Sequence, residues 1–136
     1  MSSEFFLEIL TPEKVFLAEK VQSLSVPALD GRLEILKGYI PSIISVTAGT
    51  LSVKRKGEWT DAACSDGFII VEQEKVEMFV QTAEWAHEID INRAIRDAEY
   101  AREQLRLEQS RLAYRQLEAS LARAMARLGV FRRKRK

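Results

Sequence analysis

The sequence changes its composition abruptly near residue 86, and this change constrains the fold more than any other feature. Between residues 89 and 130 there is no proline and a single glycine, Gly129, while Ala, Leu, Arg, Glu and Gln dominate. These residue types favour helix. The first 85 residues are instead punctuated by Gly, Pro and Asp at intervals of about 8 to 12 residues, which is typical of short strands. The sequence therefore predicts a β part, residues 1–86, followed by a helical part, residues 87–136.

Short runs rich in Val, Ile, Phe, Thr and Leu fill the β part. Val76, Met78 and Val80 occupy every second position, which is the period of a half-buried strand. Regularly spaced strands of this kind predict an antiparallel β-sandwich. The predicted strands are 5–10, 14–18, 21–26, 32–36, 42–46, 50–54, 58–63, 68–72 and 76–81. The glycines expected to supply positive φ angles at turns are Gly31, Gly49, Gly57 and Gly67.

The helical part is too long to be a single helix on a sandwich of this size. About 40 residues of continuous helix would span about 60 Å, so a break is expected. The most polar stretch, 106–110, is the predicted turn, and Ser110 is the predicted cap of the second helix. Asp90 is the predicted N-cap of the first helix, and Gly129 the predicted C-cap of the second, before a frayed basic tail at 132–136. The prediction is a two-helix antiparallel hairpin.

The net charge of +1 hides a strong asymmetry between the two parts. Residues 1–88 carry 8 basic and 14 acidic side chains, whereas residues 89–136 carry 13 basic and 6 acidic ones. Arginines four residues apart share one helical face, and guanidinium groups bind carboxylates or phosphates through forked donors. A solvated helix surface is the alternative interpretation, and nucleic-acid binding is a third. Two arginine pairs have this spacing: Arg111 with Arg115, and Arg123 with Arg127.

The sequence offers little of what an enzyme active site requires. His87 is the single histidine, and a linker role before the helices is its simpler interpretation. Cys64 is the only cysteine, which excludes an intrachain disulfide and a cysteine cluster for zinc. No phosphate-binding loop or dinucleotide fingerprint occurs, and no apolar stretch reaches the roughly 18 residues that cross a bilayer. We expect a non-catalytic protein that requires no cofactor and does not insert directly into a membrane.

Several short motifs occur in an order that points to one family. They are Leu10-Thr11-Pro12-Glu13, Leu29-Asp30-Gly31, Gly38-Tyr39-Ile40-Pro41, Ser65-Asp66-Gly67-Phe68, Ile89-Asp90-Ile91-Asn92-Arg93-Ala94 and Arg123-Ala124-Met125-Ala126-Arg127-Leu128. With a sandwich followed by two helices, the chain resembles the epsilon subunit of F-type ATP synthases over nearly its whole length. The resemblance implies a rotor subunit at the cytoplasmic face of the bacterial plasma membrane, whose sandwich (1–86) binds the gamma subunit and the ring of c subunits.

The resemblance also implies that the hairpin (87–136) is regulatory. In that family the hairpin either lies folded against the sandwich or extends along gamma toward the alpha and beta subunits, where its basic residues restrain ATP hydrolysis. Arg32 departs from the family, which often has glutamate at this position. The residues expected to contact partners are Arg32, Gly38, Tyr39 and Pro41 in the sandwich, and Arg111 and Arg115 in the hairpin.

Some bacterial members of the family bind ATP between the two helices, which stabilises the folded hairpin. The residues that match their motif are Glu84, Ile89, Asp90, Arg93, Ala94, Arg123 and Arg127. The resemblance assigns the two late arginines to the phosphates. Tyr100 stands where such proteins carry a further arginine. Two alternatives follow: ATP is a regulatory ligand, or Asp90 is a plain helix cap that pairs with Arg93.

Two functions outside this family fit the same features. A free-standing nucleotide sensor would close its hairpin on ATP and signal to another partner, and a nucleic-acid-binding adaptor would use the basic tail. The acidic β part argues against nucleic acid, as do the few stacking residues of the helices, Tyr100 and Tyr114. A stalk subunit that binds no nucleic acid is the function we predict.

Overall fold

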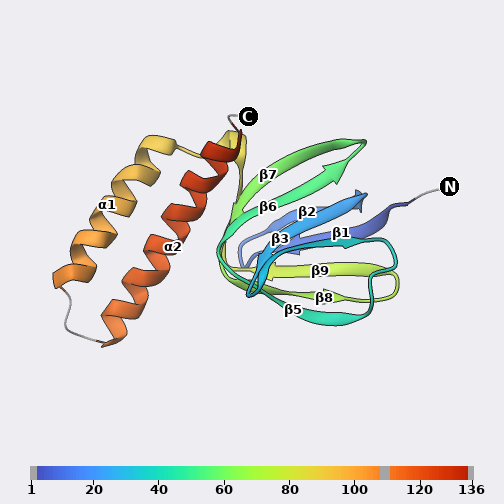
Figure 1. Cartoon of the computed structure of the whole chain (residues 1–136), viewed down its shortest axis with the longest axis horizontal. Coiled ribbons are helices and arrows are strands. Elements are labelled where there is room, and N and C mark those ends of the chain that lie inside the picture. The colour runs from blue at the N-terminus through green and yellow to red at the C-terminus, as the bar shows by residue number, and fades with distance from the viewer. Residues whose placement is uncertain (1–2, 108–110, 135–136) are drawn as a thin grey trace.

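The computed structural model of the chain describes residues 3–107 and 111–134. Ten strands come first, followed by a short 3-10 helix, η1, and two α-helices (Figure 1). The elements are β1 Phe5–Leu10, β2 Val15–Val21, β3 Ser23–Ala28, β4 Gly31–Leu36, β5 Ser42–Val46, β6 Gly49–Arg55, β7 Glu58–Cys64, β8 Gly67–Val71, β9 Lys75–Val80, β10 Ala83–Trp85, η1 Ala86–Glu88, α1 Ile91–Leu107 and α2 Arg111–Lys134.

The strands form one sheet that folds over on itself. Their order is β10-β7-β6-β3-β5-β8-β9-β1-β2, with β4 paired to β3. Figure 1 shows β6 and β7 on one side of the sandwich and β5, β8 and β9 on the other. Paired strands are antiparallel, except for β1 and β9, which are parallel. The predicted antiparallel sandwich is confirmed, with one parallel pair as the exception.

The core follows from the alternation seen in the sequence. Val76, Met78 and Val80 of β9 are buried, and the first two lie opposite Leu7 and Ile9 of β1, which are fully buried. Fully burying one such side chain stabilises the fold by about 1.5–3 kcal/mol. The sequence did not predict β10, because three residues are too few to show a period.

Two of the turn glycines have a different role from the one predicted. Gly31 and Gly57 have positive φ as expected, but the prediction is wrong for Gly49 and Gly67, which are the first residues of β6 and β8. A Cβ atom on Gly67 would lie 2.0 Å from the carbonyl oxygen of Phe79. Glycine is required there because two backbones approach closely, and not because of the φ angle.

The two helices form the predicted hairpin. α1 ends at Leu107 and α2 begins at Arg111, so the break is confirmed; Ser110, its predicted cap, lies outside the described residues. The Arg93 N–H donates to Asp90 Oδ1 at 3.1 Å, which makes Asp90 the cap of α1 as predicted.

The end of α2 departs from the prediction. Gly129 is not a C-cap, because the helix continues to Lys134 and the expected fraying does not occur up to that residue; residues 135–136 lie outside the described part. Gly129 instead faces the sandwich, where a Cβ atom would lie 3.7 Å from Thr50 Oγ1 of β6. At that distance a Cβ would make an ordinary van der Waals contact, so the packing of α2 on β6 does not require glycine at this position.

α2 joins the hairpin to the sandwich through small side chains. It packs on β6 and β7, and its Ala126 and Val130 are buried against Ala63 of β7. We name this cluster the docking seam, and its members are Ala63, Ala86, Ile89, Ala126 and Val130. Val130, with 0% exposure, is the largest side chain of the seam that is fully buried.

The buried side chains of α1, which packs against α2, are all alanines. The larger apolar side chains Ile95 and Tyr114 are instead exposed. Because an alanine buries only one methyl group, each such contact contributes less than a leucine would. The buried alanines are Ala94, Ala98, Ala101 and Ala124.

Candidate binding surfaces

The first candidate site is a crevice where the hairpin meets the sandwich. Arg127 Nε of α2 donates to Glu84 Oε1 of β10, forming an ion pair. Arg123 lies in the same crevice, and its Nη2 donates to Ser120 Oγ at 3.1 Å. The fold therefore brings together three of the residues predicted to hold a nucleotide.

This crevice is shallow and partly open to solvent. Its lining side chains leave almost no room even for a water-sized molecule. Cys64 lies at its base, where burial raises the pKa of the thiol to about 12, so the group is a neutral thiol at ordinary pH and a poor nucleophile. The lining residues are Ala63, Cys64, Thr82, Glu84, Arg123, Ala126 and Arg127.

The other predicted nucleotide residues are engaged in the local structure of the hairpin. Ile89 packs in the docking seam, and Ala94 is buried with 1% exposure. Asp90 caps α1 through the Arg93 amide. The Arg93 guanidinium pairs with Asp97 Oδ2 at 3.8 Å, so the side-chain pair of Asp90 with Arg93 is not what forms.

The second candidate site is an apolar outer surface of the sandwich. Phe79 of β9 lies between Phe68 of β8 on one side and Leu10 of β1 on the other. The two phenylalanine rings stack with centroids 5.1 Å apart. Ile43 lies opposite Ile70 in the adjacent row. Cross-strand neighbours share a face of the sheet. We name this surface the apolar face, and it comprises Leu10, Val15, Ile43, Phe68, Ile70 and Phe79.

Several side chains of the apolar face are strongly exposed: Ile43 by 76%, Val15 by 56% and Phe68 by 43%. A cavity of about 510 Å³ opens beside it, lined in part by Leu10, Phe68 and Phe79. Sequence reasoning missed this surface. The available signal was the unbroken apolar run of β8, because a strand with apolar residues on both faces is covered on both faces.

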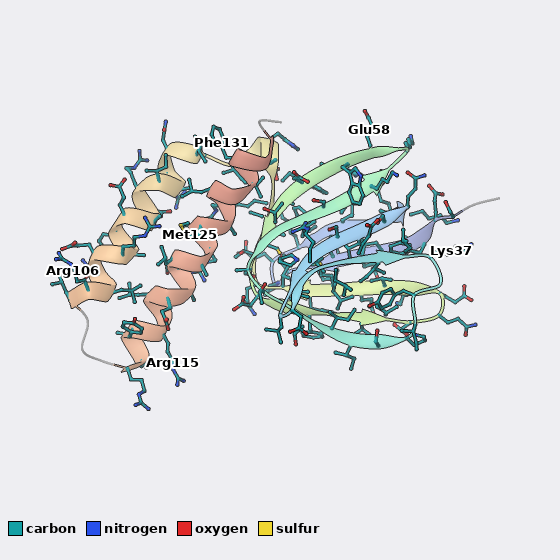
Figure 2. All side chains as sticks on the ribbon, viewed as in Figure 1. Lys37, Glu58, Arg106, Arg115, Met125 and Phe131 are labelled. Carbon is teal, nitrogen blue, oxygen red and sulfur yellow. The ribbon has the colours of Figure 1, made fainter. Side chains whose placement is uncertain are left out.

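The residues predicted to bind partners fall at three separate places. Arg32 lies across β3 and β6, where its Nε donates to Ser25 Oγ at 2.9 Å. Gly38, with φ of +88°, and Tyr39 line a cavity of about 280 Å³ at the end of the sandwich marked by Lys37 in Figure 2.

That end of the sandwich lies away from the hairpin (Figure 2). Pro41 is exposed in the loop that follows Tyr39. Arg111 and Arg115 are exposed at the start of α2, and Figure 2 shows Arg115 at the end of the hairpin far from the sandwich. Gly38, Tyr39 and Pro41 therefore lie at the opposite end of the molecule from Arg115.

The described residues also bear on metal binding and on membrane insertion. Within 3–107 and 111–134, no group of three or more His, Cys, Asp or Glu side chains is placed to hold a metal ion. Neither α1 nor α2, as far as the structure describes them, is long and apolar enough to cross a membrane. An exposed apolar face of this kind is typical of surfaces that bind other proteins.

Comparison with known proteins identifies the family. Residues 4–86 match the family model of the ATP synthase delta/epsilon chain β-sandwich domain, and residues 87–131 match that of its long α-helix domain. The chain therefore belongs to the ATP synthase delta/epsilon family. This confirms the resemblance drawn from the motifs and makes the chain a non-catalytic ATP synthase subunit.

Individual relatives agree with this membership. The ATP synthase epsilon chain of Ruminiclostridium cellulolyticum is 37% identical over 131 residues, covering 96% of this chain and 98% of that one. The ATP synthase epsilon chain of Caldanaerobacter subterraneus is 40% identical, covering 96% and 95%.

Solved structures share the fold at low identity. A chain of the Euglena gracilis mitochondrial ATP synthase has a TM-score of 0.79 and 20% identity, covering 93% of this chain and 80% of that one. A chain of the Tetrahymena thermophila mitochondrial ATP synthase, from a structure of its central stalk and c-ring, has a TM-score of 0.60 and 17% identity, covering 95% of each. These likenesses support the two-part architecture.

Proposed function

We propose that the chain is a central-stalk subunit of a bacterial F-type ATP synthase, which joins the gamma subunit to the c-ring and restrains ATP hydrolysis through its hairpin. Family membership supports the assembly, and the names of the bacterial relatives support the epsilon type. The observation that carries the proposal is the apolar face, which stays exposed in the isolated chain.

The apolar face is the proposed docking surface for gamma. Contiguous exposed apolar side chains mark protein interfaces. Ile43 lies opposite Ile70, which is on the same strand as Phe68 and two residues from it, so the side chains of the apolar face adjoin one another. The cavity beside Phe68 and Phe79 offers a place for an apolar anchor of the partner. Gamma is the occupant we propose, because a stalk subunit of this family needs one rigid, extensive contact to turn with the rotor.

The end of the sandwich near Gly38, Tyr39 and Pro41 is the proposed contact with the c-ring. It lies away from the hairpin, so the subunit can touch the ring at one end and the hydrolytic subunits at the other. Arg32 lies apart from this end, across β3 and β6, where Ser25 holds its guanidinium. We propose that it contributes a positive charge to a separate partner contact. Through these contacts the chain would be peripheral, at the cytoplasmic face of the membrane.

The hairpin is the proposed regulatory part. It lies folded against the sandwich, held by the docking seam, while Arg111 and Arg115 are exposed at its far end. Release of α2 would let these arginines reach acidic segments of the alpha and beta subunits. The small seam makes such a release inexpensive, since a few kcal/mol suffice to shift a two-state element.

ATP is a second, more specific proposal for the hairpin. Arg123 and Arg127 lie in one crevice with Glu84, and two guanidinium groups suit phosphates. Binding would require the filled crevice to open. Calorimetric titration with ATP, repeated with Arg93→Ala and Arg127→Ala, tests this: saturable binding lost in both variants supports the site, and no heat at millimolar ATP removes it.

A reconstitution tests the proposed function as a whole. A synthase complex depleted of its epsilon subunit is supplied with the full chain, or with a chain that ends at Glu88. We expect both to bind the complex, and only the full chain to lower the rate of ATP hydrolysis. A full chain that fails to bind would refute the stalk role, and equal rates with both chains would refute the regulatory role alone.

A further inference from the structure

The ion pair of Glu84 and Arg127 ties the two parts of the chain together across 43 residues of sequence. Glu84 belongs to β10, which pairs with β7 and is part of the sheet, whereas Arg127 belongs to the docked end of α2. The exposed fractions are 26% for the Arg127 side chain and 34% for Glu84. Because both groups are mostly shielded, this contact is stronger than a typical exposed ion pair.

The guanidinium of Arg127 is also one of the two groups that would bind phosphates in the proposed nucleotide site. In the folded hairpin it faces a carboxylate of the chain itself, and the crevice around it is filled. A phosphate approaching Arg127 therefore meets both the side chains that fill the crevice and the charge of Glu84.

The docking seam is also complete without a ligand. Val130 is 0% exposed and Ala126 is 5% exposed, and Gly129 lies close to Thr50 of β6. The contacts that close the hairpin are thus made by the chain alone.

We propose that Glu84 acts as an internal anion for Arg127. Their ion pair, which we name the clasp, holds the hairpin closed without a nucleotide. The inference rests on the proposed regulatory role of the hairpin, and it gives Glu84 a role opposite to that of a nucleotide ligand. In the clasp, Glu84 competes with an incoming phosphate and does not help to bind it. Release of the clasp frees the guanidinium of Arg127 for an anionic partner at the moment when α2 undocks.

Thiol labelling of the isolated full chain tests the clasp without any ATPase. Ala126→Cys, made in a Cys64→Ala background, places the only thiol in the buried seam, so its labelling rate reports the fraction of undocked hairpin. Without nucleotide, Glu84→Gln and Arg127→Gln should each raise the rate roughly ten-fold, as expected for loss of a shielded charge-assisted hydrogen bond. The double variant should label no faster than either single one, because all three lack the same contact.

Glu99→Gln is the matched control, since it removes a carboxylate from the exposed face of α1 and should leave the rate unchanged. The clasp is overturned if Glu84→Gln labels like its parent, or if the parent labels rapidly until ATP is added. Failure of the regulatory proposal is a separate result: the clasp variants would label faster while the reconstituted complex hydrolysed ATP at an unchanged rate.

Discussion

Val130→Ala should release the hairpin while leaving the sandwich intact. Val130 is fully buried in the docking seam, and the substitution deletes two methyl groups. At about 0.8 kcal/mol for each buried carbon, plus a partial cavity, the closed hairpin should lose about 2 kcal/mol. Since about 1.4 kcal/mol is a factor of ten in an equilibrium constant, the undocked fraction should rise about 30-fold.

The labelling rate of a thiol at position 126 measures this change, and Val80→Ala is the control. Val80 is buried in the core of the sandwich, with 4% exposure, so its truncation lowers the free energy of global unfolding without loosening the seam. Val130→Ala should accelerate labelling and leave the urea midpoint of the sandwich nearly unchanged. The reasoning fails if Val130→Ala labels like its parent, or if Val80→Ala accelerates labelling equally, because labelling would then follow global unfolding.

Three further predictions concern the sandwich and the start of the hairpin. Gly67→Ala should lower the free energy of unfolding by about 3 kcal/mol, whereas Gly49→Ala, whose Cβ would meet a proline side chain 3.0 Å away, should cost about 1 kcal/mol; equal losses in urea denaturation would count against this. Because the pKa of Cys64 rises from 9.0 to about 12, the folded chain keeps a proton that the unfolded chain loses. Its stability should therefore decline as the pH rises from 9 toward 12, and Cys64→Ala should lack this part of the decline. Asp90→Ala should destabilise α1 by about 1 kcal/mol and accelerate amide exchange in its first turn; unchanged exchange would argue against the cap.

Local patterns predicted the framework of the fold. Alternation located strands such as β9, and the switch to a proline-free composition located the hairpin. The cap at Asp90 could be predicted because a carboxylate at a helix start accepts a hydrogen bond from an amide only three residues away. These features depend on neighbours in the sequence, which is why a single sequence reveals them.

The errors involve partners that are distant in the sequence. Gly129 resembles a helix end until α2 is seen to continue along the sandwich to Lys134. Gly67 resembles a turn residue until Phe79 is placed next to it. Glycine serves both purposes, so its presence alone cannot distinguish them.

The candidate sites show the same limit. Glu84 and Arg127 both belong to the motif, but only the tertiary structure reveals that they pair with each other. The apolar face is assembled from strands at both ends of the sandwich sequence, such as those of Leu10 and Phe68, and no local pattern joins them.

Binding of the chain to the gamma subunit of its own synthase is the most direct test of the stalk role. Isothermal titration would compare the wild-type chain with Ile43→Ser and Phe68→Ser on the apolar face. The control is Leu112→Ser, at an apolar position of α2 that is 70% exposed, against 76% for Ile43 and 43% for Phe68. We predict saturable binding that weakens at least about ten-fold in each apolar-face variant, since buried interface anchors contribute more than 1 kcal/mol each, and is unchanged in Leu112→Ser. Wild-type affinity in both apolar-face variants would contradict the proposed docking surface, and absence of binding by the wild-type chain would contradict the stalk role itself.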